Sequence, residues 1–146
     1  MNAALRSLLR TANTLAVALY RRSGGRVGGS AKGVPVLLLT VPGRRTRTPH
    51  TVQVAYFEHD GRFLVTGTNG GSSHEPQWFR NIRATPTGRV EIGRRALDVD
   101  VRVAAPDERL ELWADVVVAQ APPFAHYEEK SGRAIPVAVL TPASPA

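Results

Sequence analysis

Residues 34–41 read VPVLLLTV, a continuous apolar run that follows Gly33 and ends at the turn residues Pro42 and Gly43. A run of this length, bounded by glycine and proline, is typical of a strand buried on both of its faces. Pro35 has no backbone N–H to donate to a neighbour, so the first residues of the strand are expected near a sheet edge. The stretch therefore predicts a buried strand that other elements cover on both sides.

Further strands follow along the chain, most of them joined by short turns. Two of them flank His59-Asp60-Gly61, and the Asp-Gly pair supplies the positive φ angles that a tight hairpin needs. In another, leucine and valine alternate with aspartate and arginine, as in an antiparallel strand with one solvated face. The expected strands are residues 34–41, 51–58, 62–68, 89–92, 96–104 and 134–141.

Three helices are expected around these strands. Residues 1–22 carry leucine and alanine at spacings of three and four, which indicates an amphipathic helix. A second helix is expected to begin at the capping residues 72–76 and to end near Ala84. A third is expected to begin near residues 106–108 and to end before Pro122.

These elements predict a single α+β domain over residues 1–146, with a frayed tail at residues 142–146. The chain has 146 residues and a mass of 15.8 kDa, which suits one domain. The short turns between strands exclude a doubly wound parallel sheet. We predict a small antiparallel barrel of about six strands, with the N-terminal helix and two further helices packed against it.

Charge is the unusual feature of the composition. The chain has 19 Lys and Arg residues against 12 Asp and Glu, and only Lys32 and Lys130 are lysines. Arginine favours phosphate and carboxylate partners, because its planar guanidinium group forms two parallel hydrogen bonds with them. The residue types alone leave three sources for the anion: a nucleic acid, a membrane surface or a small cofactor.

Cysteine is absent from the chain, which excludes disulfides, thiolate nucleophiles and Cys-ligated metal clusters. The four histidines show neither HExxH nor HxxxH spacing, so no metal site is expected. Any redox chemistry therefore requires a bound organic cofactor.

The N-terminal helix raises the question of membranes. Its uncharged run, residues 11–20, is too short to span a bilayer and is not followed by a cleavage site, so we expect a cytoplasmic protein. Packing of the apolar stripe on its own domain is the favoured interpretation. Peripheral contact with an anionic membrane, at its inner face, is the alternative. The stripe consists of Leu5, Leu8, Leu9, Ala12, Leu15, Ala16 and Leu19.

Two loops carry the residues that could do chemistry. Residues 40–51 (TVPGRRTRTPHT) place three arginines and four hydroxyl groups in one glycine turn between two strands, which favours a phosphate held in one orientation. Residues 66–73 (TGTNGGSS) lead into the helix of Trp78, where free N–H groups favour a flat polar ring or a second anion. A solvated basic turn and a flexible surface loop are the simpler interpretations. Trp113 is expected to pack in the core. Trp78 and Ile82 are also expected there, with a cofactor wall as the alternative.

Three motifs taken together resemble a known family. They are VLLLTxxGRRTR followed by TVQV, then VTGTNGG followed by PQWFRNIRATP, and the tail GRAIPVAVL. This combination resembles the deazaflavin-dependent nitroreductases of actinobacteria, over residues 15–142. The resemblance implies a split β-barrel similar to that of flavin-mononucleotide oxidoreductases. It also implies coenzyme F420, an 8-hydroxy-5-deazaflavin with a phosphate and an oligoglutamate tail, with FMN as the less favoured cofactor.

The resemblance assigns roles by position. It places the cofactor phosphate near Arg44, Arg45 and Thr46. The deazaflavin ring would lie along His50, Thr51, Val52, Gln53, Val54 and Ala55. The opposite wall would be Thr66, Gly67, Thr68 and Asn69. The helix edge would be Gln77, Trp78, Phe79, Arg80 and Asn81, with Phe124 as a lid. Thr68 and Tyr127 are the candidate catalytic residues, as proton or hydrogen-bond donors.

Five positions depart from the family pattern. The family usually has glycine at the position of Arg47, arginine at His50, proline at Gln53 and often lysine at Asn69. Two cationic contacts to the phosphate are therefore missing, and Arg47 is available to replace one of them. Tyrosine is common at the position of Phe124, so a hydroxyl on the substrate side is missing.

We therefore expect an F420H2-dependent reductase that passes a hydride to a small electron-poor acceptor such as a quinone, an enone or a nitro compound. The alternative is a non-catalytic protein that binds a deazaflavin, flavin or apolar ligand on the same barrel. Nucleic acid is not expected as a partner, because no RNA-recognition signature accompanies the arginines. An exposed barrel edge makes a homodimer a further expectation.

Overall fold

Strand β2 (Val34–Pro42) is an interior strand of the sheet, because strands pair with both of its edges. Along one edge it pairs with β3 (Pro49–Ala55), from Val36 opposite Ala55 to Pro42 opposite Pro49. Along the other it pairs with β6 (Thr87–Ile92), and its first two residues pair with β1 (Ser30–Ala31). This computed structural model describes residues 2–143.

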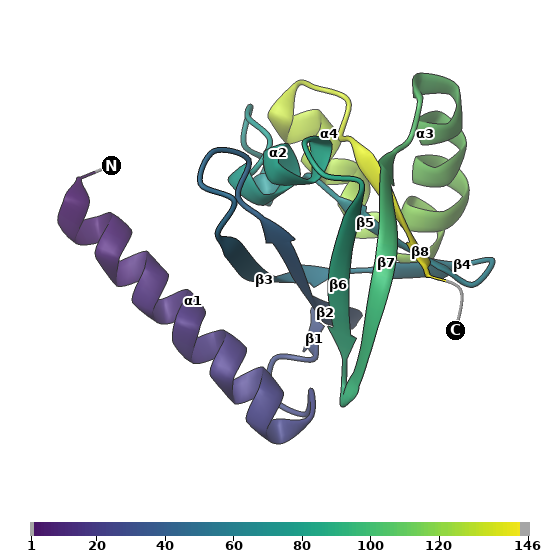
Figure 1. The fold of residues 1–146 in the computed structure, drawn as a ribbon. Coiled ribbons are helices and arrows are strands. Elements are labelled where there is room, and N and C mark those ends of the chain that lie inside the picture. The colour runs from purple at the N-terminus through teal and green to yellow at the C-terminus, as the bar shows by residue number, and fades with distance from the viewer. Residues whose placement is uncertain (1, 144–146) are drawn as a thin grey trace.

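The sheet curls on itself through a bend at Tyr56. Only this residue separates β3 from β4 (Phe57–His59), so the two are halves of one bent strand. The first half pairs with β2 and the second with β5 (Arg62–Thr66). Strands β7 (Arg95–Val103) and β8 (Val137–Pro142) complete the order β2-β6-β7-β8-β5-β4 (Figure 1). The antiparallel split barrel predicted from the sequence is confirmed.

The two faces of β2 belong to different parts of the core. Leu37, Leu39 and Val41 point into the barrel, where they join Phe79 and Ile82 among other buried side chains. Val36 and Leu38 point the other way and pack with two residues of the N-terminal helix. The central leucines of β2 are fully buried. The prediction that this strand is covered on both sides is therefore confirmed.

Within the described residues, four α-helices surround the sheet, one more than expected. They are α1 (Ala3–Ser23), α2 (Gln77–Arg83), α3 (Pro106–Leu112) and α4 (Ala125–Ser131). A π-helical segment, Trp113–Val118, continues α3, and 3-10 turns occur at Asn69–Gly71 and Pro122–Phe124. Helix α4 was not predicted from the sequence, because its seven residues, AHYEEKS, are too few and too polar to show an apolar period.

Some strand ends differ from the prediction. Strand β5 ends at Thr66, because the chain turns at Gly67, whose N–H donates to the carbonyl of Pro136. Strand β8 begins only at Val137. The frayed tail was wrong for its first two residues, since Pro142 pairs with Val99 and Ala143 donates to the carbonyl of Asp98. The remainder of that tail lies outside the described residues.

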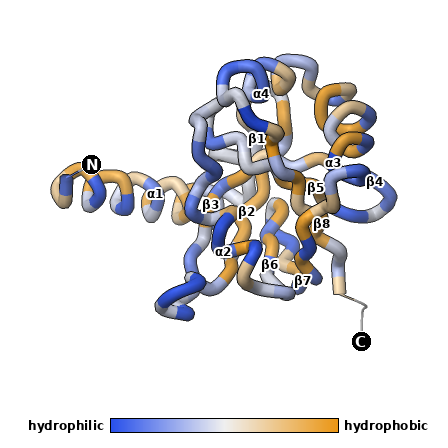
Figure 2. Tube along the Cα trace, turned by 90° about the horizontal axis from the view of Figure 1, so that it is seen from above, coloured by the Kyte–Doolittle hydropathy of each residue, from blue (hydrophilic) through white to orange (hydrophobic). Residues whose placement is uncertain are grey.

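Helix α1 packs on the barrel by its C-terminal half only, and its N-terminal half extends away from it (Figures 1 and 2). The packed side carries Asn13, Val17 and Tyr20, which lie on a different side of the helix from the leucines because successive residues are about 100° apart. Packing of the leucine stripe on its own domain was therefore wrong. The exposed leucines and their exposed fractions are Leu5 44%, Leu8 64%, Leu9 50%, Leu15 60% and Leu19 53%. Within residues 2–143, no helix is long and apolar enough to cross a membrane.

Tyr20 fastens α1 to the barrel. Its side chain is buried, and its hydroxyl lies 3.0 Å from the carbonyl oxygen of Val36 and 3.2 Å from that of Glu91. The same hydroxyl accepts from the N–H of Gly93 at 3.0 Å. One phenol thus satisfies backbone groups of β2 and of the turn after β6.

We expect Tyr20→Phe to lower the free energy of unfolding by about 1–3 kcal/mol, because it leaves buried backbone groups without a partner. Urea unfolding followed by circular dichroism measures the change. Leu15→Ala on the same helix is the matched control and should cost less than about 0.5 kcal/mol, since this side chain is 60% exposed. Equal losses in the two variants would contradict the anchoring role of Tyr20.

Candidate functional site

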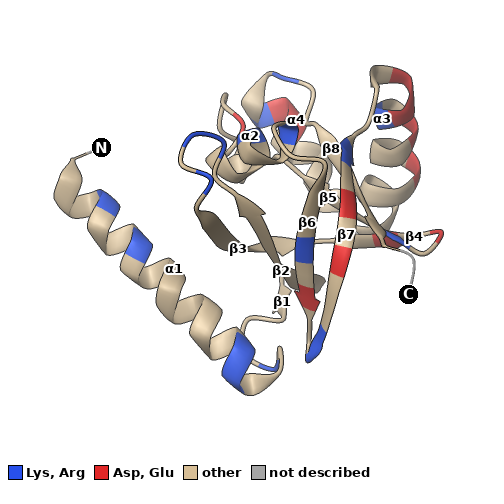
Figure 3. Cartoon of the chain, viewed as in Figure 1, with Lys and Arg blue, Asp and Glu red and all other residues tan. Residues whose placement is uncertain are grey.

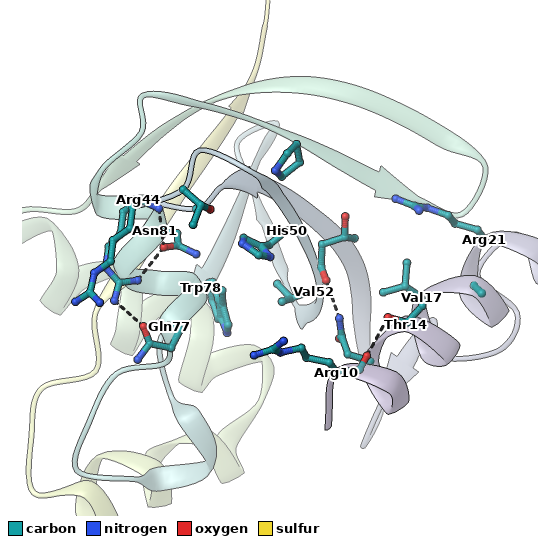
Figure 4. A pocket seen from close by; sticks show the side chains of 17 residues that line it. Arg10, Thr14, Val17, Arg21, Arg44, His50, Val52, Gln77, Trp78 and Asn81 are labelled. Atoms are coloured by element: carbon teal, nitrogen blue, oxygen red, sulfur yellow. Dashed lines mark hydrogen bonds between the residues drawn. The ribbon is translucent and has the colours of Figure 1, made fainter. Parts of the chain in front are cut away.

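A cleft of about 750 Å³ separates α1 from the barrel (Figure 4). This volume is in the usual range for small-molecule sites. Helix α1 forms one wall, β3 contributes residues beside it, and the β2–β3 loop and α2 form the other wall. The lining residues are Arg10, Asn13, Thr14, Val17, Ala18, Arg21, Gly43, Arg44, Arg45, Thr46, Pro49, His50, Thr51, Val52, Gln77, Trp78 and Asn81.

The β2–β3 loop is a tight turn closed by its own backbone. The N–H of Gly43 donates to the carbonyl of Thr48 at 2.8 Å, and the N–H of Arg47 donates to the carbonyl of Gly43 at 2.9 Å. A Cβ at Gly43 would lie only 3.0 Å from Nε2 of His50 and 3.1 Å from Oγ1 of Thr46. Glycine here lets these side chains close over the turn. The loop therefore presents its arginines from a compact backbone.

Arg44 is held by two neutral amides. Its Nη1 donates to Oδ1 of Asn81 at 2.8 Å, and its Nη2 donates to Oε1 of Gln77 at 2.6 Å. The backbone N–H of Arg44 donates to the same Asn81 oxygen at 3.1 Å. Asn81 itself is buried. Amide oxygens orient a guanidinium group without neutralising it, so the charge of Arg44 stays available for an anion.

The charge in the cleft is positive. Among the described residues, none of those that line it is Asp or Glu. Arg21 pairs with Glu91, whose carboxylate accepts from Nη2 at 2.9 Å and from Nε at 3.0 Å, and this hydrogen bonding raises the pKa of Arg21 above its usual value. Within residues 2–143, Arg10, Arg44 and Arg45 form no ion pair with an acidic residue. An anionic ligand in this cleft would therefore meet little electrostatic repulsion from carboxylates.

The charge is segregated along the chain (Figure 3). Residues 1–57 contain nine Lys and Arg residues and no Asp or Glu, whereas residues 58–146 contain ten Lys and Arg residues and all twelve acidic ones. Helix α1 and the β2–β3 loop both belong to the first stretch. The two walls of the cleft thus come largely from the part of the chain that has no acid.

Polar contacts join α1 to the edge of β3. Nδ2 of Asn13 donates to the carbonyl of Thr51 at 3.0 Å, and Nε2 of Gln53 lies 3.5 Å from the carbonyl of Ala16. The hydroxyls of Thr40 and Thr51 lie 2.7 Å apart across β2 and β3. Asn13 and Gln53 thus both join α1 to β3.

The cleft brings together about half of the residues singled out from the sequence. Those that line it are Arg44, Arg45, Thr46, His50, Thr51, Val52, Gln77, Trp78 and Asn81. Trp78, expected in the core, is half-buried and forms part of the wall, while Ile82 and Trp113 are core residues as expected. The predicted residues outside the lining are Gln53, Val54, Ala55, Thr66, Gly67, Thr68, Asn69, Phe79, Arg80, Phe124 and Tyr127, and their roles stay predictions.

The predicted second wall, residues 66–69, is shaped by Arg133. Its guanidinium donates to the carbonyl oxygens of Gly67 at 2.8 Å, Thr68 at 3.2 Å and Ser72 at 3.1 Å. A Cβ at Gly67 would lie 3.1 Å from the ring of Phe79, so the backbone packs closely on α2. Sequence reasoning missed Arg133, because a lone arginine after a helix gives no signal of its carbonyl partners.

Phe124 and Tyr127 belong to a separate aromatic group. The ring of Phe124 meets that of Tyr127 edge-on at 5.1 Å and that of Phe57 at 5.2 Å. This group packs with a buried cluster that includes Val116 and Val117 of the π-helical segment after α3. It does not border the cleft.

Helix α1 supplies the lining residues that the sequence analysis missed. Arg10, Asn13, Thr14, Val17 and Arg21 recur at spacings of three and four, which is a helical face in its own right. The neighbouring leucine stripe is the stronger apolar pattern. The sequence analysis therefore predicted that the leucine side, and not this face, packs on the barrel.

Comparison with known proteins identifies the family. Residues 12–142 match the family model described as F420H(2)-dependent quinone reductase. The chain belongs to this family. It is 31% identical to the F420H(2)-dependent quinone reductase of Mycobacterium tuberculosis strain H37Rv over 127 residues, which cover 85% of each chain. The resemblance to deazaflavin-dependent enzymes is thereby confirmed.

Two solved structures are similar to this member of the quinone reductase family. An F420-H2 dependent reductase, FDR-A, has a TM-score of 0.65 and 31% identity, over 73% of this chain and 93% of that one. A domain-swapped dimer has a TM-score of 0.65 and 29% identity, over 85% of this chain and 98% of that one. The F420H2-dependent family implies coenzyme F420 as the cofactor.

Arg47 adopts the left-handed conformation with φ 63°. A side chain is disfavoured there by about 1–2 kcal/mol relative to glycine. Arg47 is outside the cleft lining, and its role toward the phosphate stays a prediction.

We expect Arg47→Gly to be more stable than Arg47→Ala by about 1 kcal/mol, because both variants lose the guanidinium group but only glycine removes the Cβ. Urea unfolding of the two variants measures this difference. Equal stabilities would mean that the turn relaxes around residue 47.

Proposed function

We propose that this protein is an F420H2-dependent quinone reductase that uses the cleft between α1 and the barrel to hold its cofactor. The observation that carries the proposal is the clamp of Arg44 by Asn81 and Gln77 in a cleft without acidic lining residues. When bound, the reduced deazaflavin supplies the hydride, and the quinone takes this hydride and one proton to become a hydroquinone.

The residues of the cleft fit the parts of F420. Arg44, Arg45 and the hydroxyl of Thr46 offer charge and hydrogen bonds to a phosphate. Trp78 and Val52 offer apolar surface to a flat ring, with Val17 of α1 on the opposite wall. The protein's part is to orient the cofactor and to exclude water, for which α1 serves as the cover.

The proton for the quinone is assigned to Thr68 or Tyr127, on the strength of the family resemblance. Neither residue lines the cleft, so the assignment requires the acceptor to reach beyond it. If Tyr127 is the donor, Tyr127→Phe lowers kcat about tenfold or more and leaves F420 affinity unchanged. An unchanged kcat would leave Tyr127 with only its packing contact to Phe124.

We expect Arg44→Gln to weaken F420 binding by about ten- to a hundredfold, because it removes a charge-assisted contact to the phosphate. Titration of the protein into F420, followed by deazaflavin fluorescence, measures the dissociation constant. Arg89→Gln is the control, since Arg89 is exposed on β6 and outside the cleft.

The same preparation tests turnover. Wild-type protein with F420H2 and a soluble quinone should form oxidised F420 in proportion to hydroquinone. Binding of F420 without oxidation by any quinone would support a non-catalytic role. Failure to bind F420 at micromolar concentration would reject the proposal altogether.

We also propose that the leucine stripe of α1 contacts an anionic membrane surface peripherally. Five exposed leucines lie on one helix, and the helix carries four arginines and no acid. Two copies of such a helix would repel each other, whereas anionic lipid would attract it. Quinones that partition into lipid would then be within reach of the same molecule.

Leu8→Gln combined with Leu15→Gln should lower co-sedimentation with phosphatidylglycerol vesicles at least tenfold, because two apolar anchors are lost. F420 affinity should not change, since neither leucine lines the cleft. The stripe is instead an interface between two copies if two results are found together. The wild-type protein then does not co-sediment with the vesicles, and it forms a dimer that the double variant does not form. The relative described as a domain-swapped dimer makes this second outcome worth measuring.

A further inference from the structure

The carbonyl oxygens of the loop between β5 and α2 converge on one side chain. Nη2 of Arg133 donates to the carbonyls of Gly67 at 2.8 Å and Thr68 at 3.2 Å. The same nitrogen donates to the carbonyl of His74 at 3.2 Å, and Nε donates to that of Ser72 at 3.1 Å. A guanidinium group presents its donors in a fixed planar fork, so the carbonyls that it binds are fixed relative to one another.

The charge of Arg133 is stabilised by these carbonyl dipoles. Within residues 2–143, Arg133 forms no ion pair with an acidic residue. Residues 67–76 belong to no strand or α-helix, so Arg133 supplies donors that regular structure would otherwise supply. The conformation of this loop therefore depends on a side chain that is distant in the sequence.

A second cation from the same segment contacts the loop. Nζ of Lys130 lies 3.3 Å from the carbonyl oxygen of Gly70, and a Cβ at Gly71 would lie only 2.7 Å from Cδ of Lys130. Helix α4 is itself tied to α3, because Glu128 accepts a hydrogen bond from the buried Arg109. The loop is thus fastened to α4 as well as to α2.

These contacts join the predicted catalytic residues to the wall of the cleft. Thr68 lies in the loop, and Tyr127 lies on α4. The loop leads into the first turn of α2, where Gln77 and Trp78 line the cleft and Gln77 accepts from Arg44. A shift of the loop would therefore move the hydroxyl of Thr68 and the wall at Trp78 together.

We propose that Arg133 is a positioning residue for hydride transfer, which fixes the loop of Thr68 and the first turn of α2 relative to the cofactor. The inference rests on the proposed function, because it assumes that F420 occupies the cleft. Arg133 is outside the lining of the cleft, so it acts through the backbone that it binds. A misplacement of about 1 Å at a reacting centre costs on the order of a hundredfold in rate.

The phosphate site should depend only weakly on Arg133. Arg44 keeps its two hydrogen bonds to Asn81, which is buried further along α2. Only the bond to Gln77 involves the first turn. Arg133→Ala should therefore lower kcat for quinone reduction about tenfold or more, and weaken F420 binding by less than about threefold.

Guanidinium ion should restore the function of Arg133→Ala in part. At millimolar concentration the free ion can bind the same carbonyls and raise kcat, whereas an equal concentration of NaCl should not. Arg133→Lys should have a kcat between those of the wild-type protein and Arg133→Ala, since it keeps the charge but not the planar fork.

Arg102→Ala is the matched control. It also removes an arginine with two hydrogen bonds, in this case to Glu108, and Arg102 is outside both the loop and the cleft. Its kcat should equal that of the wild-type protein, with or without guanidinium.

Hydrogen exchange followed by mass spectrometry tests the positioning without cofactor or turnover. In Arg133→Ala, the amides of residues 67–78 should exchange about tenfold faster or more, because the carbonyl contacts that hold the loop are lost. The amides of β2 should exchange at the wild-type rate. Guanidinium should slow the exchange of residues 67–78 in this variant.

Four results would overturn the assignment. They are an unchanged kcat in Arg133→Ala, a lowered kcat that guanidinium does not raise, an equal loss of kcat and of F420 affinity, and faster exchange throughout the chain in both Arg133→Ala and Arg133→Lys. A wild-type protein that neither binds F420 nor oxidises F420H2 overturns the proposed function instead. The exchange of residues 67–78 then still shows whether Arg133 holds the loop.

Discussion

The structure depends on the burial of β2 on both of its faces. One face fills the barrel with Leu37, Leu39 and Val41, while Val36 and Leu38 on the other face pack under α1. Tyr20 closes the second contact, because its hydroxyl satisfies backbone groups on β2 and beside β6. The strand that organises the barrel therefore also fixes the helix that covers the cleft. The barrel and the cleft therefore both depend on the packing of β2.

The sequence predicts elements well where a single period extends over many residues. The six strands are found near their expected positions, because apolar runs and alternation are local patterns that the barrel preserves. The conformation of residues 66–69, the predicted second wall of the site, was harder to predict. Its form depends on carbonyl contacts to Arg133, more than sixty residues away, and no local pattern reports such a contact.

The N-terminal helix shows a different limit. Its existence was predictable from the spacing of leucine and alanine, and in the structure Asn2 caps its first turn and Gly24 ends it. Its orientation was not predictable, since two faces compete and the more apolar one does not contact the barrel. A hydrophobic stripe indicates that some surface will be buried, but it does not say whether the partner belongs to the same molecule. The candidate site was incomplete for this reason, because its α1 wall comes from the less apolar face.

The attachment of α1 to β3 has a consequence for the behaviour of the protein in solution. Among the described strands, β3 pairs only with β2, so its outer edge offers free backbone groups to any other strand. Such edges are templates for aggregation unless something covers them. Asn13 binds the carbonyl of Thr51 on this edge, and α1 lies against it. Helix α1 thus covers the cleft and also blocks intermolecular strand pairing at this edge. Removing α1 to shorten the protein for expression would therefore promote aggregation.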